Sequence, residues 1–204
     1  MPIHALLWDL GGVIVRTEDW TPRDALAARL GLTRAALNAA VFGPAEGRNP
    51  VQLGNLSVAD YHAGIAAALG LPLEEVPAAL AEFYGGDVTD PLLVEELRRL
   101  RAAYRLVLVS NHTPDLRQRL QGGPLEDLFH RLVISAEVGL AKPDPAIFEL
   151  ALEQAGCLPE ESVFIDDHEP NVVAARALGL HGIVFTSPGQ ALADLHDLLE
   201  EKTI

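Results

Sequence analysis

The sequence predicts an α/β protein, with a parallel sheet core and an all-helical domain inserted into that core. Two observations lead to this fold class. Five short apolar runs alternate with helical patterns, an order that favours a parallel sheet with right-handed crossovers. One long stretch near the N-terminus interrupts this alternation, because it contains helical patterns and no convincing strand.

The apolar runs have the length and composition of buried parallel strands. They are Ile3–Trp8, Leu106–Val109, Leu132–Ile134, Val163–Ile165 and Ile183–Phe185. The first run stops at a single carboxylate, Asp9, which is followed by Leu10 and two glycines. This pattern is typical of a strand that delivers one acid to the ligand-binding edge of a sheet.

Several helix starts are marked by a capping side chain followed by proline at the first helical position. These pairs are Asp90-Pro91, Asp144-Pro145 and Ser187-Pro188. A further helix is expected over roughly residues 171–178, with Gly179 as its C-terminal stop.

Residues from about 16 to 87 form the inserted segment. Four helical patterns fill it, and Thr21, Thr33 and Ser57 are candidate N-caps. The patterns cover Pro22–Leu30, Arg34–Phe42, Val58–Leu69 and Leu73–Tyr84. We therefore expect a discontinuous core, residues 1–15 and 88–204, with residues 16–87 as a helical cap.

Composition limits the possible partners. The net charge is −14, from 15 Lys and Arg against 29 Asp and Glu, which argues against a nucleic-acid binder because such proteins need basic faces. No apolar stretch reaches the roughly 18 residues that span a membrane, and no signal peptide is expected. The single cysteine, Cys157, permits no internal disulfide and suits a cytoplasmic location.

Polar residues follow four of the predicted strands. Asp9 follows the first, Ser110-Asn111 the second, Lys142 lies after the third, and Asp166-Asp167 follow the fourth. Parallel topology brings these strand ends to one edge of the sheet. Each residue alone has a plainer explanation as turn, cap or surface chemistry, so the conjunction carries the prediction.

Together these residue types suit phosphoryl transfer. Aspartate can act as a nucleophile toward phosphorus, and two or three carboxylates suit octahedral Mg²⁺. A hydroxyl, an amide and a lysine can hold phosphate oxygens and offset charge that develops in the transition state. A small phosphorylated substrate is therefore expected, attracted locally despite the acidic chain.

At these residues the chain resembles the haloacid dehalogenase-like (HAD) hydrolases, in particular sugar-phosphatase-like members with a helical cap. The resemblance rests on Leu6-Leu7-Trp8-Asp9-Leu10-Gly11-Gly12-Val13, Val109-Ser110-Asn111, Lys142-Pro143 and Phe164-Ile165-Asp166-Asp167. It implies a Rossmann-like core in which Asp9 forms an aspartyl-phosphate that water hydrolyses. It also implies Mg²⁺ held by Asp9, the backbone carbonyl of Gly11, Asp167 and, secondarily, Asp166.

Gly11 departs from the pattern of the family's phosphatases, most of which carry an aspartate there as general acid and base. Glycine keeps the carbonyl for the metal but removes a proton donor, an effect typically worth about 10²–10⁴ in rate. His112 and His168 flank two of the motifs and are alternative proton donors, although a neutral structural role is the plainer interpretation.

Two other functions stay open at this stage. A 2-haloacid dehalogenase would also use Asp9, but it needs no metal, and the resembling enzymes lack the acidic pair. A non-catalytic phosphate-ligand or protein-binding module is the other alternative, since Gly11 replaces the acid. Trp20 and residues 46–55 are candidate substrate contacts, and the sequence does not indicate an oligomeric state.

Overall fold

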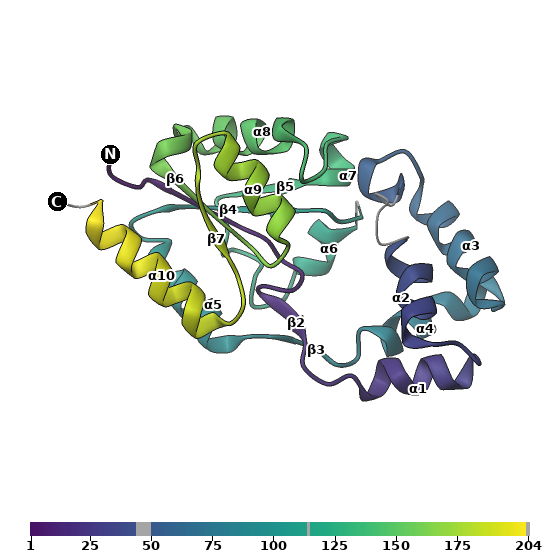
Figure 1. Cartoon of the computed structure of the whole chain (residues 1–204). Coiled ribbons are helices and arrows are strands. Elements are labelled where there is room, and N and C mark those ends of the chain that lie inside the picture. Colours follow the sequence, from purple (N-terminus) through teal and green to yellow (C-terminus); the bar gives the residue numbers. More distant parts are fainter. Residues whose placement is uncertain (44–49, 114, 203–204) are drawn as a thin grey trace.

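The computed structural model describes residues 1–43, 50–113 and 115–202. Its centre is a five-stranded parallel sheet with strand order β5-β4-β1-β6-β7 (Figure 1). The strands are β1 (Ala5–Trp8), β4 (Arg105–Ser110), β5 (Arg131–Ile134), β6 (Ser162–Asp166) and β7 (His181–Val184). The parallel α/β core expected from the sequence is confirmed.

Strand β1 lies at the middle of the sheet because its side chains are apolar on both faces. Leu6 and Trp8 point into one core cluster, whereas Ala5 and Leu7 point into another. Helices α5 (Pro91–Leu100) and α10 (Pro188–Glu201) cover the first face, and α8 (Pro145–Ala155) and α9 (Glu169–Ala177) cover the second (Figure 1). Two shorter helices are α6 (Leu116–Leu120) and α7 (Ser135–Val138), and η3 (Pro159–Glu161) is a single 3₁₀ turn.

The proline-marked helix starts are confirmed. The side chains of Asp90, Asp144 and Ser187 each accept hydrogen bonds from backbone N–H groups in the first turn of their helices. Helix α9 begins at Glu169, two residues earlier than expected.

Strand β7 was placed too late by the sequence. It covers His181–Val184 and ends before Phe185. The apolar pattern missed its start because Gly182, which pairs with Phe164 of β6, contributes no apolar side chain. A Cβ at Gly182 would lie 2.6 Å from Cγ1 of Val172, so the close packing of α9 on this strand requires glycine.

The segment between β1 and α5 consists mainly of helices with a core of their own. They are α1 (Thr21–Arg29), α2 (Arg34–Phe42), α3 (Val58–Leu69) and α4 (Val76–Phe83), with 3₁₀ turns η1 (Pro50–Leu53) and η2 (Leu73–Glu75). Their buried side chains, among them Leu26, Leu37, Ile65 and Phe83, form a third cluster separate from the two beside the sheet. These helices lie together beyond one end of the sheet, the end at which β2 and β3 are drawn (Figure 1).

Two of the three N-caps expected here are confirmed. Thr33 and Ser57 accept hydrogen bonds from Ala36 N and Asp60 N. Thr21 is not the cap of α1: it is the first helical residue, and its backbone N–H donates to the Asp19 carboxylate at 2.9 Å.

The structure adds a two-stranded antiparallel ribbon that the sequence did not predict. It pairs β2 (Val15–Thr17) with β3 (Asp87–Thr89), residues 70 or more positions apart in the chain. The ribbon joins the helical segment to the sheet, and the domain boundaries expected at residues 15/16 and 87/88 fall within it. Three-residue strands show no alternation strong enough to read from sequence.

Among the helices of the described residues, none by itself is long and apolar enough to cross a membrane. The pair Val58–Leu69 and Leu73–Phe83 meets that test only jointly, and it is bent by 103° at its break.

Candidate active site

The carboxyl ends of the central strands meet at one cavity. Asp9 follows β1, while Ser110 ends β4 and Asp166 ends β6, the two strands that pair with β1. The cavity, about 770 Å³ in volume, lies between this edge of the sheet and the helical segment, and Asp9, Ser110 and Lys142 line it.

Lys142 joins the two buried acids. Its Nζ lies 2.7 Å from Asp9 Oδ1 and 2.6 Å from Asp166 Oδ2, and the lysine itself is only 3% exposed. Burial alone would lower the pKa of Lys142, but the Asp9 and Asp166 carboxylates outweigh that effect and raise it. The lysine is therefore a fixed cation in contact with Asp9.

Asp9, Asp166 and Asp167 form a cluster of three carboxylates, one oxygen of each lying within 4.8 Å of the others. Burial raises the pKa values of Asp9 and Asp167, and the Asp166 charge adds to both shifts. Such a group of acids is costly unless cations neutralise it, and within the described part of the chain Lys142 is the one cation paired with these three carboxyls.

The two adjacent acids have different surroundings. Both oxygens of Asp166 accept hydrogen bonds, Oδ1 from His168 N at 2.7 Å and Oδ2 from Lys142 and Asn171 Nδ2. Asp166 is fully buried, whereas Asp167 is exposed toward the cavity that it lines. Asp167 is thus the more accessible oxygen donor.

The two glycines after Asp9 differ in what they require. Gly12 has φ +80°, and a Cβ there would lie 2.2 Å from Asp167 Oδ2, so the close approach of Asp167 demands glycine. Gly11 has an ordinary φ, and a Cβ on it would meet no atom of the described residues within 4 Å. The backbone therefore does not explain why position 11 is glycine.

Ser110 and Asn111 differ in the hydrogen bonds that their side chains make. Ser110 lines the cavity, and its hydroxyl makes no hydrogen bond to any described residue. The Asn111 side chain instead braces the lysine: its Oδ1 accepts from Lys142 N and its Nδ2 donates to Lys142 O, both at 2.9 Å. The amide expected to bind phosphate thus holds the Lys142 backbone in place.

The two histidines considered from the sequence have separate positions. His112 lines the cavity, and its Nδ1 lies 2.9 Å from Thr113 Oγ1. Burial lowers the pKa of His112, and Arg119 lowers it further. His168 is exposed just before α9 and does not line the cavity.

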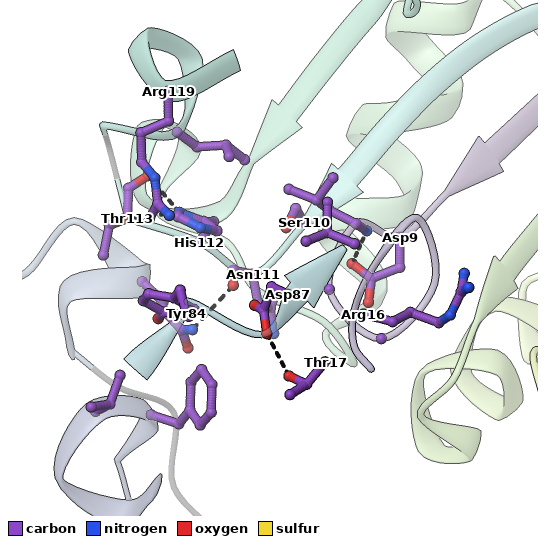
Figure 2. A pocket seen from close by; sticks show the side chains of 18 of the residues that line it. Asp9, Arg16, Thr17, Tyr84, Asp87, Ser110, Asn111, His112, Thr113 and Arg119 are labelled. Carbon is purple, nitrogen blue, oxygen red and sulfur yellow. Dashed lines mark hydrogen bonds between the residues drawn. The ribbon is translucent and has the colours of Figure 1, made fainter. Parts of the chain in front are cut away.

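The far wall of the cavity comes from the helical segment. Trp20, one of the expected contacts, lines it, as do Tyr61 and Tyr84. Figure 2 shows Asp9 on one side and Tyr84 and Arg119 away from it; the Arg119 guanidinium lies 5.4 Å from the centre of the Tyr84 ring. The sequence carried no signal for Tyr61, Tyr84 or Arg119, because only the tertiary fold brings them to the cavity that Asp9 lines.

Part of the loop expected to contact substrate, residues 46–55, lies outside the described residues, namely residues 46–49. Its described end does reach the site: Gln52 Nε2 donates to the backbone oxygen of Asn111 at 3.0 Å. This contact connects the helical segment directly to the strand end beside Lys142.

Comparison with known proteins places this arrangement in a family. The chain brings an aspartate and a lysine into contact at the carboxyl edge of a parallel sheet. The family model of haloacid dehalogenase-like hydrolases matches residues 3–179. The chain belongs to the haloacid dehalogenase-like hydrolases.

Two curated relatives are similar over most of their length. The sesquiterpene phosphatase astK of Aspergillus oryzae is 27% identical over 199 residues, 96% of each chain. The D-ribitol-5-phosphate phosphatase of Bacteroides thetaiotaomicron is 26% identical over 186 residues, 87% of this chain and 89% of the relative.

Solved structures share the fold. A HAD family enzyme of Bacteroides thetaiotaomicron, in complex with magnesium and inorganic phosphate, has a TM-score of 0.73 and 26% identity over 90% of this chain and 94% of its own. A HAD-like hydrolase of Porphyromonas gingivalis, 24% identical, has a TM-score of 0.74 over 96% of this chain and 98% of its own.

Proposed function

We propose that this protein is a Mg²⁺-dependent phosphatase that hydrolyses a small phosphomonoester, a sugar phosphate or a similar compound, through an aspartyl-phosphate intermediate. The observation that carries the proposal is the Lys142 ammonium, which lines the cavity and is held between Asp9 and Asp166. Phosphatase relatives of similar length, one acting on a sugar-alcohol phosphate by its name, support it.

Asp9 is the proposed nucleophile. Its Oδ1 accepts hydrogen bonds from Leu10 N and Lys142 Nζ, both at 2.7 Å, and among the described residues Oδ2 has no such partner. We assign Oδ2 to the attack on phosphorus: a new Oδ2–P bond forms while the bond from phosphorus to the ester oxygen breaks. The departing alkoxide takes a proton from water, and a second water then releases phosphate and regenerates Asp9.

Two neighbouring groups assist this exchange. Burial raises the pKa of Asp9, which disfavours the ionised nucleophile, and the Lys142 cation opposes that effect. The same ammonium, together with the unpartnered Ser110 hydroxyl, is placed to hold the incoming phosphate oxygens.

The carboxylate cluster fits a magnesium ion, which prefers oxygen ligands. Asp9, Asp167 and the carbonyl of Gly11 would hold it, because Asp166 already uses both oxygens in hydrogen bonds and would contribute second. When bound, Mg²⁺ would neutralise part of the charge on Asp9 and on the phosphate. A clustered triad of acids favours this chemistry over the metal-independent 2-haloacid dehalogenase.

Residues 16–87 are proposed to act as the cap. Their aromatic wall, with Trp20 and Tyr84, faces the cavity opposite Asp9, so it would contact the organic part of the substrate. The β2/β3 ribbon, whose strands are only three residues long, is the connection about which such a cap would open.

The test is release of phosphate from a panel of sugar phosphates, nucleotides and small phosphoacids, measured with Mg²⁺ and with EDTA. We expect turnover of at least one class only with Mg²⁺, and none by an Asp9→Asn variant with unchanged circular dichroism. Lack of turnover on every class, or full activity of Asp9→Asn freshly prepared to avoid deamidation, would overturn the proposal.

A further inference from the structure

A second cavity lies at the opposite edge of the sheet, where the strands begin. It is about 480 Å³ in volume, and its lining includes residues just before β1 and β4. The starts of these strands lie on the side of the N-terminus, away from the helical segment (Figure 1). We call it the basic edge pocket; its polar lining consists of His4, Arg101, Tyr104, Arg105, His130 and Glu161. One strand length, about 15 Å, separates it from Asp9.

The pocket concentrates positive charge in an acidic chain. The protein has a net charge of −14, yet Arg101 and Arg105 line this one cavity against a single acid, Glu161. Most other described arginines are paired with carboxylates, as Arg16, Arg34 and Arg117 are. Among the described residues, the guanidinium groups of Arg101 and Arg105 have no hydrogen-bond or ion-pair partner.

Glu161 does not neutralise the pocket. One of its oxygens accepts a hydrogen bond from Leu158 N at 3.0 Å, which ties the carboxylate to the η3 turn. No ion pair joins it to either arginine within the described chain. One acid therefore faces two unpaired cations.

His130 adds a neutral donor to the same pocket. Its Nδ1 accepts a hydrogen bond from Leu106 N at 3.0 Å, so the ring proton of the neutral imidazole lies on Nε2. Burial lowers the pKa of His130, and Arg101, Arg105 and Arg131 lower it further, which keeps the ring neutral. The Nε2–H donates to no described residue.

The two guanidinium groups and the imidazole N–H of this pocket can donate hydrogen bonds but cannot accept them. Such a set matches a ligand that only accepts hydrogen bonds and carries more than one negative charge. We propose that the basic edge pocket binds a small multivalent oxyanion of the phosphate class through Arg101, Arg105 and His130. This site is independent of the proposed active site, since it shares no residue with it.

The test follows the histidine side-chain resonances by NMR while inorganic phosphate is added to the intact protein in EDTA, at constant ionic strength set with sodium chloride. His130→Gln identifies the His130 signal among the seven histidines. We expect a saturable shift of that signal, and a dissociation constant about tenfold weaker in Arg101→Gln and in Arg105→Gln.

Arg99→Gln is the matched control. Arg99 lies on the neighbouring helix α5, pairs with Glu95 and Glu96, and does not line the pocket, so its removal should leave the constant unchanged. A linear shift, an equal shift with chloride alone, or wild-type affinity in both arginine variants would overturn the inference. Both arginines are exposed, so the single variants are expected to fold, and phosphate release at Asp9 should persist in them.

Discussion

Lys142 is the residue on which the site depends most. Its ammonium is the cation in contact with both buried acids, Asp9 and Asp166. Such an arrangement stabilises the fold only while all three members are present, because a lone buried charge is costly. The same contact that we propose to activate Asp9 therefore also bears on the stability of the fold.

Lys142→Met should lower both activity and stability. We expect kcat to fall about 10²–10³-fold, the usual cost of removing one transition-state donor. In EDTA, urea unfolding should show a loss of about 3 kcal/mol, since Asp9 and Asp166 are left unpaired. Lys142→Arg, which keeps the charge, is the control for stability. Unchanged stability of Lys142→Met would mean that the two acids are protonated in the wild type.

Gly11 and Gly12 should respond differently to side chains. Gly11→Ala should be tolerated, because no described residue lies within 4 Å of its added Cβ, whereas Gly12→Ala must clash with Asp167 and should lose metal-dependent activity. Steady-state rates and circular dichroism of the two variants give the comparison. Equal losses in both would show that position 11 is constrained by something other than space.

The open space at Gly11 also predicts a dependence on the leaving group. Without a proton donor there, aryl phosphates should react far faster than alkyl phosphates. Gly11→Asp should raise alkyl turnover selectively, by about 10²-fold, and the ordinary φ of Gly11 makes this substitution feasible. Equal wild-type rates for both esters, with no gain in a folded variant, would show that water, a histidine or the substrate already supplies the proton.

At the scale of elements, a Ser or Thr near the start of a helix should stabilise it only where its side chain makes the capping hydrogen bond. Ser57 Oγ accepts from Asp60 N, so Ser57→Ala should destabilise the protein by about 1 kcal/mol. Thr21→Ala should cost clearly less, because Thr21 is the first residue of α1 and not its cap. Thermal or urea unfolding of both variants decides, and a larger loss for Thr21→Ala would contradict the assignment.

At the scale of the whole molecule, the carboxylate cluster couples metal binding to folding. Mg²⁺ at a hundred times its dissociation constant should add about 2.7 kcal/mol to the free energy of unfolding, seen as a Tm several degrees above that in EDTA. Asp167→Asn should remove most of this response, while Asp127→Asn, at an exposed position away from the cavity, should keep it. An identical Tm with Mg²⁺ and EDTA would speak against the metal site.

Many strands and helix starts of the core could be predicted from the sequence, because interactions between residues close in sequence determine them. Continuous apolar runs predict buried strands, Asp90 and Asp144 before proline predict helix starts, and both follow from interactions within a few residues. The convergence of Asp9, Lys142 and Asp166 followed from one further rule, that parallel strands share an edge.

Contacts between distant segments were decided by the tertiary structure alone. The β2/β3 ribbon joins residues whose pairing no local pattern encodes, and Gly182 enters β7 because α9 packs closely on it. Asn111, expected to hold phosphate, braces the Lys142 backbone across 31 residues of sequence. By itself the sequence determined the five strands of the parallel sheet to within about two residues, most helix starts and the set of residues at the sheet edge. Which oxygens stay free, what faces Asp9 across the cavity and which glycine is required depended on long-range packing, because those properties belong to pairs of segments that meet only in the folded chain.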